Sequence, residues 1–246
     1  VDWFQRAEAN QYTQPDLYLA RARAYLSQKR YARSIEDLDR VFRQKDLSLS
    51  MQAEASYVRG RARTEEGREL SSAREDLEAA GAMGYDASGM DQYFLGRIDL
   101  KEGKPKPARK RFEALVRSGM THPQIRYFLA QSYFELGNVK ESHRVVTEAI
   151  YQSPFQARFF RLRGKCRLQL EQFEGAEEDL DKALALDVED FEPLVGLFFS
   201  YIGQGRFDRC LDMQGLVNNL YGQGWNEPVS LFDPRSTDFL ARYVEG

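Results

Sequence analysis

The sequence predicts an all-α solenoid of about six helical hairpins, because one pattern of residues recurs along most of the chain. Each copy has a small residue, a second small residue about twelve positions later, an apolar residue four further on, and an apolar or small residue three beyond that. The first small position recurs at spacings of 38, 36, 34, 34 and 34 residues. It is occupied by Ala22, Gly60, Gly96, Ala130, Gly164 and, in the sixth copy, Phe198.

Small residues are needed where two helices approach most closely, since a larger side chain would push the axes beyond about 8–10 Å. The second small position is occupied by Ser34, Ala73, Ala108, Ser142, Ala176 and Cys210. The apolar position is occupied by Leu38, Leu77, Phe112, Val146, Leu180 and, exceptionally, Gln214. The last position is occupied by Val41, Ala80, Leu115, Ala149, Ala183 and Val217.

Turn residues divide each copy into two helices. In the fourth copy, the apolar and aromatic residues within 124–136 predict a helix with a broad buried surface, Gly137 and Asn138 break it, and residues 139–151 supply the second helix. Gly67, Gly103 and Gly205 end the first helix elsewhere, whereas the fifth copy turns without glycine, with Gln172 in the equivalent region. The expected hairpins cover about 15–48, 53–86, 89–121, 123–154, 157–188 and 191–222.

The remaining segments are expected to extend the solenoid. Phe4 and Ala7 lie 34 residues before Leu38 and Val41, so residues 1–12 are interpreted as the end of a preceding repeat. Residues 223–246 form either a capping helix or the start of a further repeat. Extra residues at the first two junctions, 45–51 and 80–86, predict longer loops or lengthened helices.

The 34-residue period, with its small and apolar positions and with Pro154 closing the fourth copy, resembles the tetratricopeptide repeat over about residues 16–222. The resemblance implies a right-handed superhelix whose inner groove is lined by the first helix of each hairpin and binds partners. Some positions depart from the family pattern. Arg63, Asp99 and Arg167 stand where the family usually has large apolar residues. Phe198 and Gln214 predict less regular packing in the sixth unit.

Composition narrows the class of protein. The chain has 246 residues, 42% hydrophobic and 30% charged, which is typical of a soluble folded chain; with the repeat, it predicts one elongated domain. A net charge of −3 gives no overall basic field for nucleic acid or anionic membranes. No apolar stretch approaches the roughly 20 residues of a membrane span. Two cysteines and two histidines are too few for a disulfide scaffold or a convincing zinc site, so no metal or cofactor is expected.

Helical spacing predicts which side chains of the first helices face the groove. The columns one residue after, three before and four after the first small position carry mainly cations, aromatic residues and apolar residues, respectively. The candidate partner-binding residues are Arg23, Tyr57, Arg61, Tyr93, Arg97, Tyr127, Gln131, Phe134, Arg161 and Lys165.

The columns support two interpretations. In one, the groove holds an extended or helical segment of a protein partner, possibly acidic: Arg and Lys pair with its carboxylates, and Tyr supplies rigid contact area. In the other, the tyrosines pack between hairpins, and carboxylates such as Glu65, Asp99 and Glu135 neutralise the arginines. The Lys, Asn and Arg set with which some family members bind chaperone tails has no counterpart here.

Other notable residues favour structural roles. The basic run 104–111 and the acidic stretch 171–192 are interpreted as solvated faces. Cys166 and Cys210 fall at or beside small positions and are expected to be buried. His122 and His143 are expected at the surface or as helix caps. No phosphate loop, nucleophile elbow or metalloprotease motif occurs, so no catalytic residues are assigned.

The sequence therefore favours a non-enzymatic interaction module, an adaptor or scaffold that binds a protein segment in its groove. Two alternatives stay open: a periplasmic scaffold segment of a bacterial secretion or polysaccharide-export assembly, and, against the 34-residue steps and acidic pI, an RNA-binding helical repeat. Self-association is also compatible with the sequence. The compartment, cytoplasmic or bacterial periplasmic, is left undecided.

Overall fold

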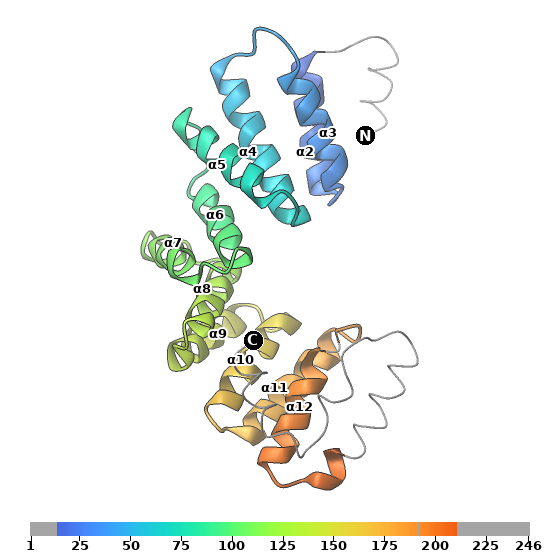
Figure 1. Ribbon diagram of the computed structural model, residues 1–246, viewed down its shortest axis with the longest axis vertical. Helices are drawn as coiled ribbons and strands as arrows, with labels where there is room; N and C mark the ends of the chain where they lie inside the picture. Colours follow the sequence, from blue (N-terminus) through green and yellow to red (C-terminus); the bar gives the residue numbers. More distant parts are fainter. Residues whose placement is uncertain (1–13, 191, 211–246) are drawn as a thin grey trace. The chain divides into compact units, whose positions relative to one another are not determined.

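A computed structural model of the chain describes residues 14–190 and 192–210 (Figure 1). Every regular element in these residues is an α-helix, as the repeat pattern predicts. The chain divides into two compact units, residues 1–119 and 120–246. Unit 1 contains α2 (Pro15–Ser27), α3 (Tyr31–Phe42), α4 (Leu49–Glu66), α5 (Leu70–Ala82), α6 (Met90–Lys101) and α7 (Pro105–Arg117). Unit 2 contains α8 (Pro123–Glu135), α9 (Val139–Gln152), α10 (Ala157–Gln169), α11 (Phe173–Leu186) and α12 (Glu192–Gly203).

The helices pack as hairpins, α2 with α3, α4 with α5 and α6 with α7 in unit 1, and α8 with α9 and α10 with α11 in unit 2. First helices also contact the first helices of neighbouring hairpins, as α4 does with α6 and α10 does with α12. Within each unit this is the side-by-side stacking of a solenoid. The expected second helix of the sixth hairpin and the segments 1–12 and 223–246 lie wholly or mostly outside the described residues.

The turn between the two helices of a hairpin has one recurring geometry. A residue with positive φ follows the first helix, and in five hairpins the next backbone N–H donates back to the carbonyl five residues earlier, as from Asn138 to Tyr133 at 2.9 Å. Glycine supplies the positive φ in four hairpins. In the fifth hairpin the residue in this conformation is Glu171, with φ 57°, and not Gln172, which the sequence interpretation had placed there. In the first hairpin it is Lys29, with φ 58°.

The two helices of a hairpin approach most closely at the first small position, where a large side chain of the second helix rests. A Cβ atom added to Gly60 would lie 2.8 Å from Leu77 Cγ, and one added to Gly164 would lie 2.8 Å from Leu180 Cγ. At Gly96 the added Cβ would lie 2.7 Å from Cζ of Phe112. The leucines and the phenylalanine are almost completely buried, so the spacing of the hairpin is set by this contact.

Charged residues at family-atypical positions form ion pairs within hairpins. Arg63 lies 2.7 Å from the buried Asp76, and Arg167 lies 3.1 Å from the buried Asp179. In the third hairpin the charges are exchanged between the helices, because Asp99 of α6 accepts from Arg111 of α7 at 2.9 Å. The departures from the apolar pattern are therefore compensated in pairs, since a buried carboxylate needs a cation or hydrogen-bond donors beside it.

A second series of arginines, each on a first helix, pairs with Asp76, Asp179 and the equivalent Asp37. The arginine one position before the first small residue donates through Nε and one terminal nitrogen to both oxygens of an aspartate on the second helix, at distances of 2.6–3.0 Å. The pairs are Arg21 with Asp37, Arg59 with Asp76 and Arg163 with Asp179. A bidentate pair of this kind, here called a clamp, fixes the register of one helix on the other. If one helix slid along the other, the arginine and the buried aspartate would both lose their hydrogen-bond partner.

Extra residues at the first two junctions are accommodated differently. α4 begins at Leu49, where Ser48 Oγ accepts the N–H of Met51 at 3.2 Å, and the helix is lengthened to 18 residues. The second junction forms a loop between α5 and α6 that contains Gly84 and Gly89, both with positive φ. The extra residues thus lengthen a helix at the first junction and a loop at the second.

Replacing Gly96 by Ala should destabilise unit 1 by about 1–3 kcal/mol, because the new methyl group meets the Phe112 ring. In the double variant with Phe112→Leu the loss should be smaller than the sum of the two single losses, since the smaller side chain makes room. Urea unfolding measures the free energies. Gly81→Ala is the control: no atom lies within 4 Å of the added Cβ, so the helix should keep or gain stability. Equal losses at both glycines would contradict the prediction.

Lys29→Gly should stabilise the protein by up to about 1 kcal/mol, because glycine adopts positive φ without the steric cost that lysine has. The matched variant is Gly137→Ala at the equivalent turn, where the space around the added Cβ is open and only backbone strain is introduced. It should lose about 1 kcal/mol. Thermal and urea unfolding measure the change in stability of both variants. Changes of the same sign in the two variants would be inconsistent with the turn geometry.

Candidate functional site

The first helices of unit 2 enclose a cavity of about 230 Å³. Its walls come from α8, α10 and the start of α12. Nine residues line it: Tyr127, Gln131, Phe134, Glu135, Arg158, Arg161, Leu162, Lys165 and Glu192. Five of these, Tyr127, Gln131, Phe134, Arg161 and Lys165, are among the ten residues that helical spacing selected.

An aromatic stack forms one wall of this cavity. The Tyr127 ring stacks on Phe159 of α10 with centroids 5.2 Å apart, and the guanidinium of Arg158 lies 4.8 Å from the Tyr127 centroid. Burial raises the pKa of Tyr127, although Arg158 and Arg161 oppose the shift, so its hydroxyl stays neutral at physiological pH. The wall therefore offers a rigid ring, a hydroxyl and an adjacent cation.

The cations in the cavity face carboxylates of their own chain. Arg161 lies 2.7 Å from Glu192, and it also pairs with Asp190. Lys165 pairs with Glu192 as well. Both cations belong to α10, and the carboxylates belong to the loop and first turn that lead into α12. One carboxylate, that of Glu192, thus occupies the position where an acidic group of a ligand would meet Arg161 and Lys165.

Glu135 provides a second carboxylate at the edge of the cavity. The Gln131 amide donates to Glu135 Oε1 at 3.0 Å. Partial removal of water from Glu135 raises its pKa, and the hydrogen bond from Gln131 opposes that shift. The cavity consequently combines side chains of both signs of charge with the side-chain amide of Gln131.

The predicted residues of unit 1 have different surroundings. Tyr57 and Tyr93 are each only 9% exposed; Tyr57 stacks on Tyr85 at 4.7 Å, and Tyr93 packs edge-on against Phe112. Their rings therefore fill the space between helices and offer little area to a partner.

The predicted arginines of unit 1 differ in how far they are engaged. Arg97 donates from both terminal nitrogens to the two oxygens of Glu65, at 2.6 and 3.0 Å, and Arg23 pairs with Glu54. Arg61 is exposed, lies 5.6 Å from the Phe94 centroid, and forms no ion pair or hydrogen bond with the described part of the chain. Among the predicted cations of unit 1, Arg61 thus has the fewest interactions with the described part of the chain.

Four cavity residues were not selected from the sequence: Glu135, Arg158, Leu162 and Glu192. Arg158 and Glu192 lie six positions before the first small position of their repeats, Leu162 two before it and Glu135 five after it. These positions lie on the same helical face as the three columns that were used. A wider angular window on the helix would therefore have found them.

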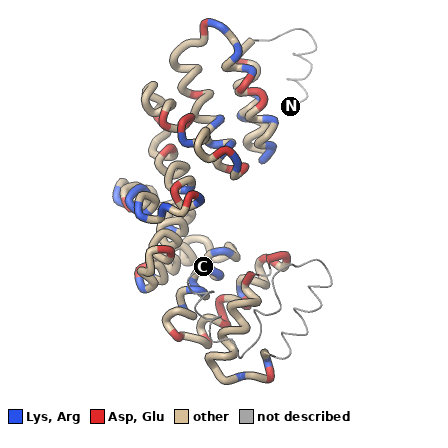
Figure 2. The backbone as a smooth tube through the Cα atoms, viewed as in Figure 1, with Lys and Arg blue, Asp and Glu red and all other residues tan. Residues whose placement is uncertain are grey.

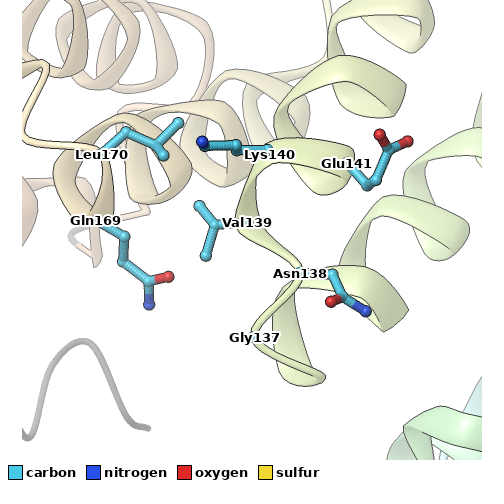
Figure 3. Close-up of a pocket in the computed structure, with 7 residues that line it drawn as sticks. All are labelled: Gly137, Asn138, Val139, Lys140, Glu141, Gln169 and Leu170. Atoms are coloured by element: carbon cyan, nitrogen blue, oxygen red, sulfur yellow. The ribbon is translucent and has the colours of Figure 1, made fainter.

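A larger hollow of about 490 Å³ lies at the other edge of unit 2, between the turn into α9 and the end of α10 (Figure 3). Val139 and Lys140 lie toward Leu170, whereas Asn138 and Glu141 point away, so no set of polar groups converges there (Figure 3). The equivalent turn of unit 1 has a similar hollow of about 440 Å³, beside Lys29 and Glu66. The recurrence indicates a consequence of stacking hairpins and not a dedicated binding site.

Reactive groups outside the cavity have structural surroundings. Cys166 and Cys210 are buried free thiols, and burial raises the pKa of Cys166 to about 11, which keeps it protonated. His122 Nδ1 accepts the N–H of Gln124 at 3.3 Å at the start of α8. Burial, followed by Arg167 and Arg163, lowers the pKa of His143, which is therefore neutral at pH 7.

Neither a metal cluster nor a membrane span is found in the described ranges. No three or more His, Cys, Asp or Glu side chains of residues 14–190 and 192–210 are grouped so that they could hold a metal ion. Among the helices assigned there, none is long and apolar enough to cross a membrane.

Comparison with known families gives one match. The sequence profile of the tetratricopeptide repeat matches residues 19–87, 93–157 and 129–190, more than half of the chain. No curated protein matches the sequence significantly.

Solved structures share the fold at low sequence identity. YrrB, described as a tetratricopeptide repeat protein with an unusual peptide-binding site, is 22% identical, with 78% of this chain and 95% of that chain covered and a TM-score of 0.56. MamA from Desulfovibrio magneticus RS-1 is 17% identical, with 72% and 97% covered and a TM-score of 0.57. The type IV pilus biogenesis factor PilW is 12% identical, with 93% and 98% covered and a TM-score of 0.68.

The Glu65–Arg97 pair predicts a pH-dependent contribution to stability. Burial raises the pKa of Glu65, but the bonds and charge of Arg97 outweigh burial and lower it below its ordinary value. A lowered carboxyl pKa stabilises the fold above the unfolded value, about 4.3, and this contribution is lost as the pH falls through the folded value. Glu65→Gln should therefore cost on the order of 1 kcal/mol at about pH 7 and much less at about pH 3, measured by urea unfolding.

The control for this pair is Glu78→Gln. Glu78 is an exposed carboxylate of α5 and forms no ion pair with any residue in the described ranges. Its replacement should change stability little at either pH. A Glu65→Gln effect that does not depend on pH would contradict the assignment of an ionised pair.

Proposed function

This chain belongs to the tetratricopeptide repeat family, and we propose that the cavity between α8, α10 and α12 is part of a groove that binds an extended segment of another protein. Tetratricopeptide repeat proteins are protein-interaction scaffolds and are generally non-enzymatic. The observation that carries the proposal is the convergence of aromatic, cationic and amide side chains from α8 and α10, with Glu192 of α12, into one cavity. The groove is small in volume, which suits a few residues of an extended chain better than a large cofactor.

Each side chain has a role in this proposal. Tyr127, Phe134 and Leu162 supply apolar contact area, and aromatic side chains lose little conformational entropy when they bind. Arg158, Arg161 and Lys165 face carboxylates or backbone carbonyls of the partner. The Gln131 amide bonds to the partner's backbone.

Acidic partner segments are favoured by the charges at the cavity. A partner carboxylate would replace Glu192 beside Arg161 and Lys165, so the cations would exchange one anionic partner for another without being left unpaired. Arg61, exposed on α4, extends the same preference in unit 1. The other predicted residues of unit 1, Arg23, Tyr57, Tyr93 and Arg97, would contribute chiefly by shaping the surface of that unit's own first helices, because they contact the chain itself.

The test uses a displayed library of random peptides of about 12 residues, selected on the wild-type chain. Selected peptides should carry Asp or Glu, and Arg161→Glu with Lys165→Glu should weaken their binding by at least about tenfold, since two attractive contacts become repulsive. Fluorescence anisotropy of labelled peptides measures the dissociation constants. Circular dichroism and urea unfolding verify that the variant folds.

The matched control is Lys140→Glu with Arg144→Glu on α9, which makes the same change in net charge outside the cavity. Peptide affinity should be unchanged in this variant. Three results would contradict the proposal: selected peptides that bind the groove variant as tightly as the wild type, equal losses in both variants, or a single-stranded RNA probe that binds the wild type and loses affinity in the Arg161 and Lys165 variant.

A further inference from the structure

The second helices of the hairpins carry charge patterns that differ from one hairpin to the next. Lys and Arg are concentrated on α7 (Figure 2). Four exposed cations define what we call the basic face of α7: Lys104, Lys106, Lys110 and Arg117. Lys106 and Lys110 form no ion pair with residues 14–190 or 192–210, and Lys104 pairs only with Glu102, at 2.8 Å.

Exposed carboxylates follow α11 in the same way. Exposed Glu171 lies in the turn before α11, and the acidic face of α11 itself consists of Glu174, Glu178 and Asp181, all exposed, at intervals of four and three residues. This spacing places them on one side of the helix. Within the described part of the chain, the nearest cation to Glu178 is Arg167, at 4.0 Å, while Glu171, Glu174 and Asp181 form no ion pair.

The two faces occupy equivalent repeat positions. Lys106 and Lys110 are two repeat lengths before Glu174 and Glu178. The intervening helix α9 has Lys140 and Arg144 at these positions, and there Arg144 is neutralised on its own helix by Glu141 at 3.0 Å and Glu148 at 2.5 Å. The charges of α9 are therefore largely satisfied within the helix, whereas α7 and α11 each keep an excess of one sign.

Arg117 lies in the last turn of α7, where the helix dipole favours a cation, but the cations at the start of α7 are not placed to stabilise their own helix. Lys104 and Lys106 lie at its N-terminal end, and the first turn has no acidic residue. The partial positive charge of a helix N-terminus repels cations. Glu174, in contrast, lies in the first turn of α11, where the dipole favours it. An external acidic surface would relieve the repulsion at α7, and such a surface exists on the same polypeptide.

We propose that the basic face of α7 in one copy of the chain docks onto the acidic face of α11 in a second copy. Both faces lie on second helices, so this contact is separate from the groove of the first helices and independent of the proposed peptide binding. A second copy fits better than a nucleic acid, because a polyanion would be repelled by the exposed Glu75 and Glu78 of α5, which belongs to the same unit as α7. The small net charge of −3 opposes association only weakly.

Exposed ion pairs are individually weak, so the association should be reversible, with a dissociation constant on the order of 10–100 µM at low salt. Salt should weaken it strongly, since the screening length falls well below the size of the contact. Sedimentation velocity of the 246-residue chain across a wide concentration range, in about 50 mM and about 500 mM NaCl, measures both quantities.

A charge exchange identifies the two faces. Lys106→Glu with Lys110→Glu should be monomeric alone, because an acidic α7 then meets an acidic α11. Glu174→Lys with Glu178→Lys should be monomeric for the opposite reason. An equimolar mixture of the two variants should associate, because each remaining natural face meets a complementary one and the two altered faces also attract each other.

Two variants control for net charge. Lys140→Glu with Arg144→Glu on α9 matches the first variant, and Glu75→Lys with Glu78→Lys on α5 matches the second; both should associate like the wild type. The proposal is overturned by a wild-type chain that is monomeric at all concentrations, by a mixture that stays monomeric, or by control variants that lose association equally. It is also overturned if only binding to a heparin probe depends on Lys106 and Lys110 while self-association does not.

Discussion

The close approach of two helices at one small residue is the constraint from which the rest of the structure follows. At Gly60, Gly96 and Gly164, a large side chain of the second helix occupies the space that a Cβ atom would need. The contact fixes the distance between the helices, and it therefore fixes which faces of the first helices remain open toward their neighbours. The cavity lined by Tyr127, Arg161 and their neighbours lies on such an open face. A binding surface made of separate helices can be rigid here because each hairpin is held by tight packing.

Ion pairs further restrict how the two helices of the same hairpins are oriented on each other. A leucine pressed against glycine tolerates small rotations of a helix, but a bidentate pair such as Arg163 with Asp179 tolerates few. Where the third hairpin has Asp99 on its first helix, the arginine moves to the second helix as Arg111. The fourth hairpin has Leu129 and Val145 at the clamp positions and uses apolar contact alone. The repeat thus keeps its geometry with more than one solution, because in each case the buried aspartate has an arginine partner or both positions are apolar.

The charged residues outside these clamps differ between the first and the second helices of the hairpins. First helices contribute the proposed groove, in which Arg161 and Lys165 already pair with carboxylates that a partner would replace. Second helices contribute the outer charges, which are balanced within α9 but not within α7 or α11. The net charge of the chain conceals both features, because it sums over surfaces that act separately.

Periodicity in the sequence by itself determined the helical repeat, the small-residue contacts and the glycine turns, because all three depend on residues close along the chain or at fixed repeat positions. It also selected five residues of the unit 2 cavity, since one face of a helix follows from spacing alone. Only the tertiary structure decided that Tyr57 and Tyr93 are buried and that Arg97 is held by Glu65, because these outcomes depend on how side chains of neighbouring hairpins fill the space between them. The clamp aspartates could have been found by comparing repeat columns. Glu192 could not, because its role depends on the approach of the α12 N-terminus to α10.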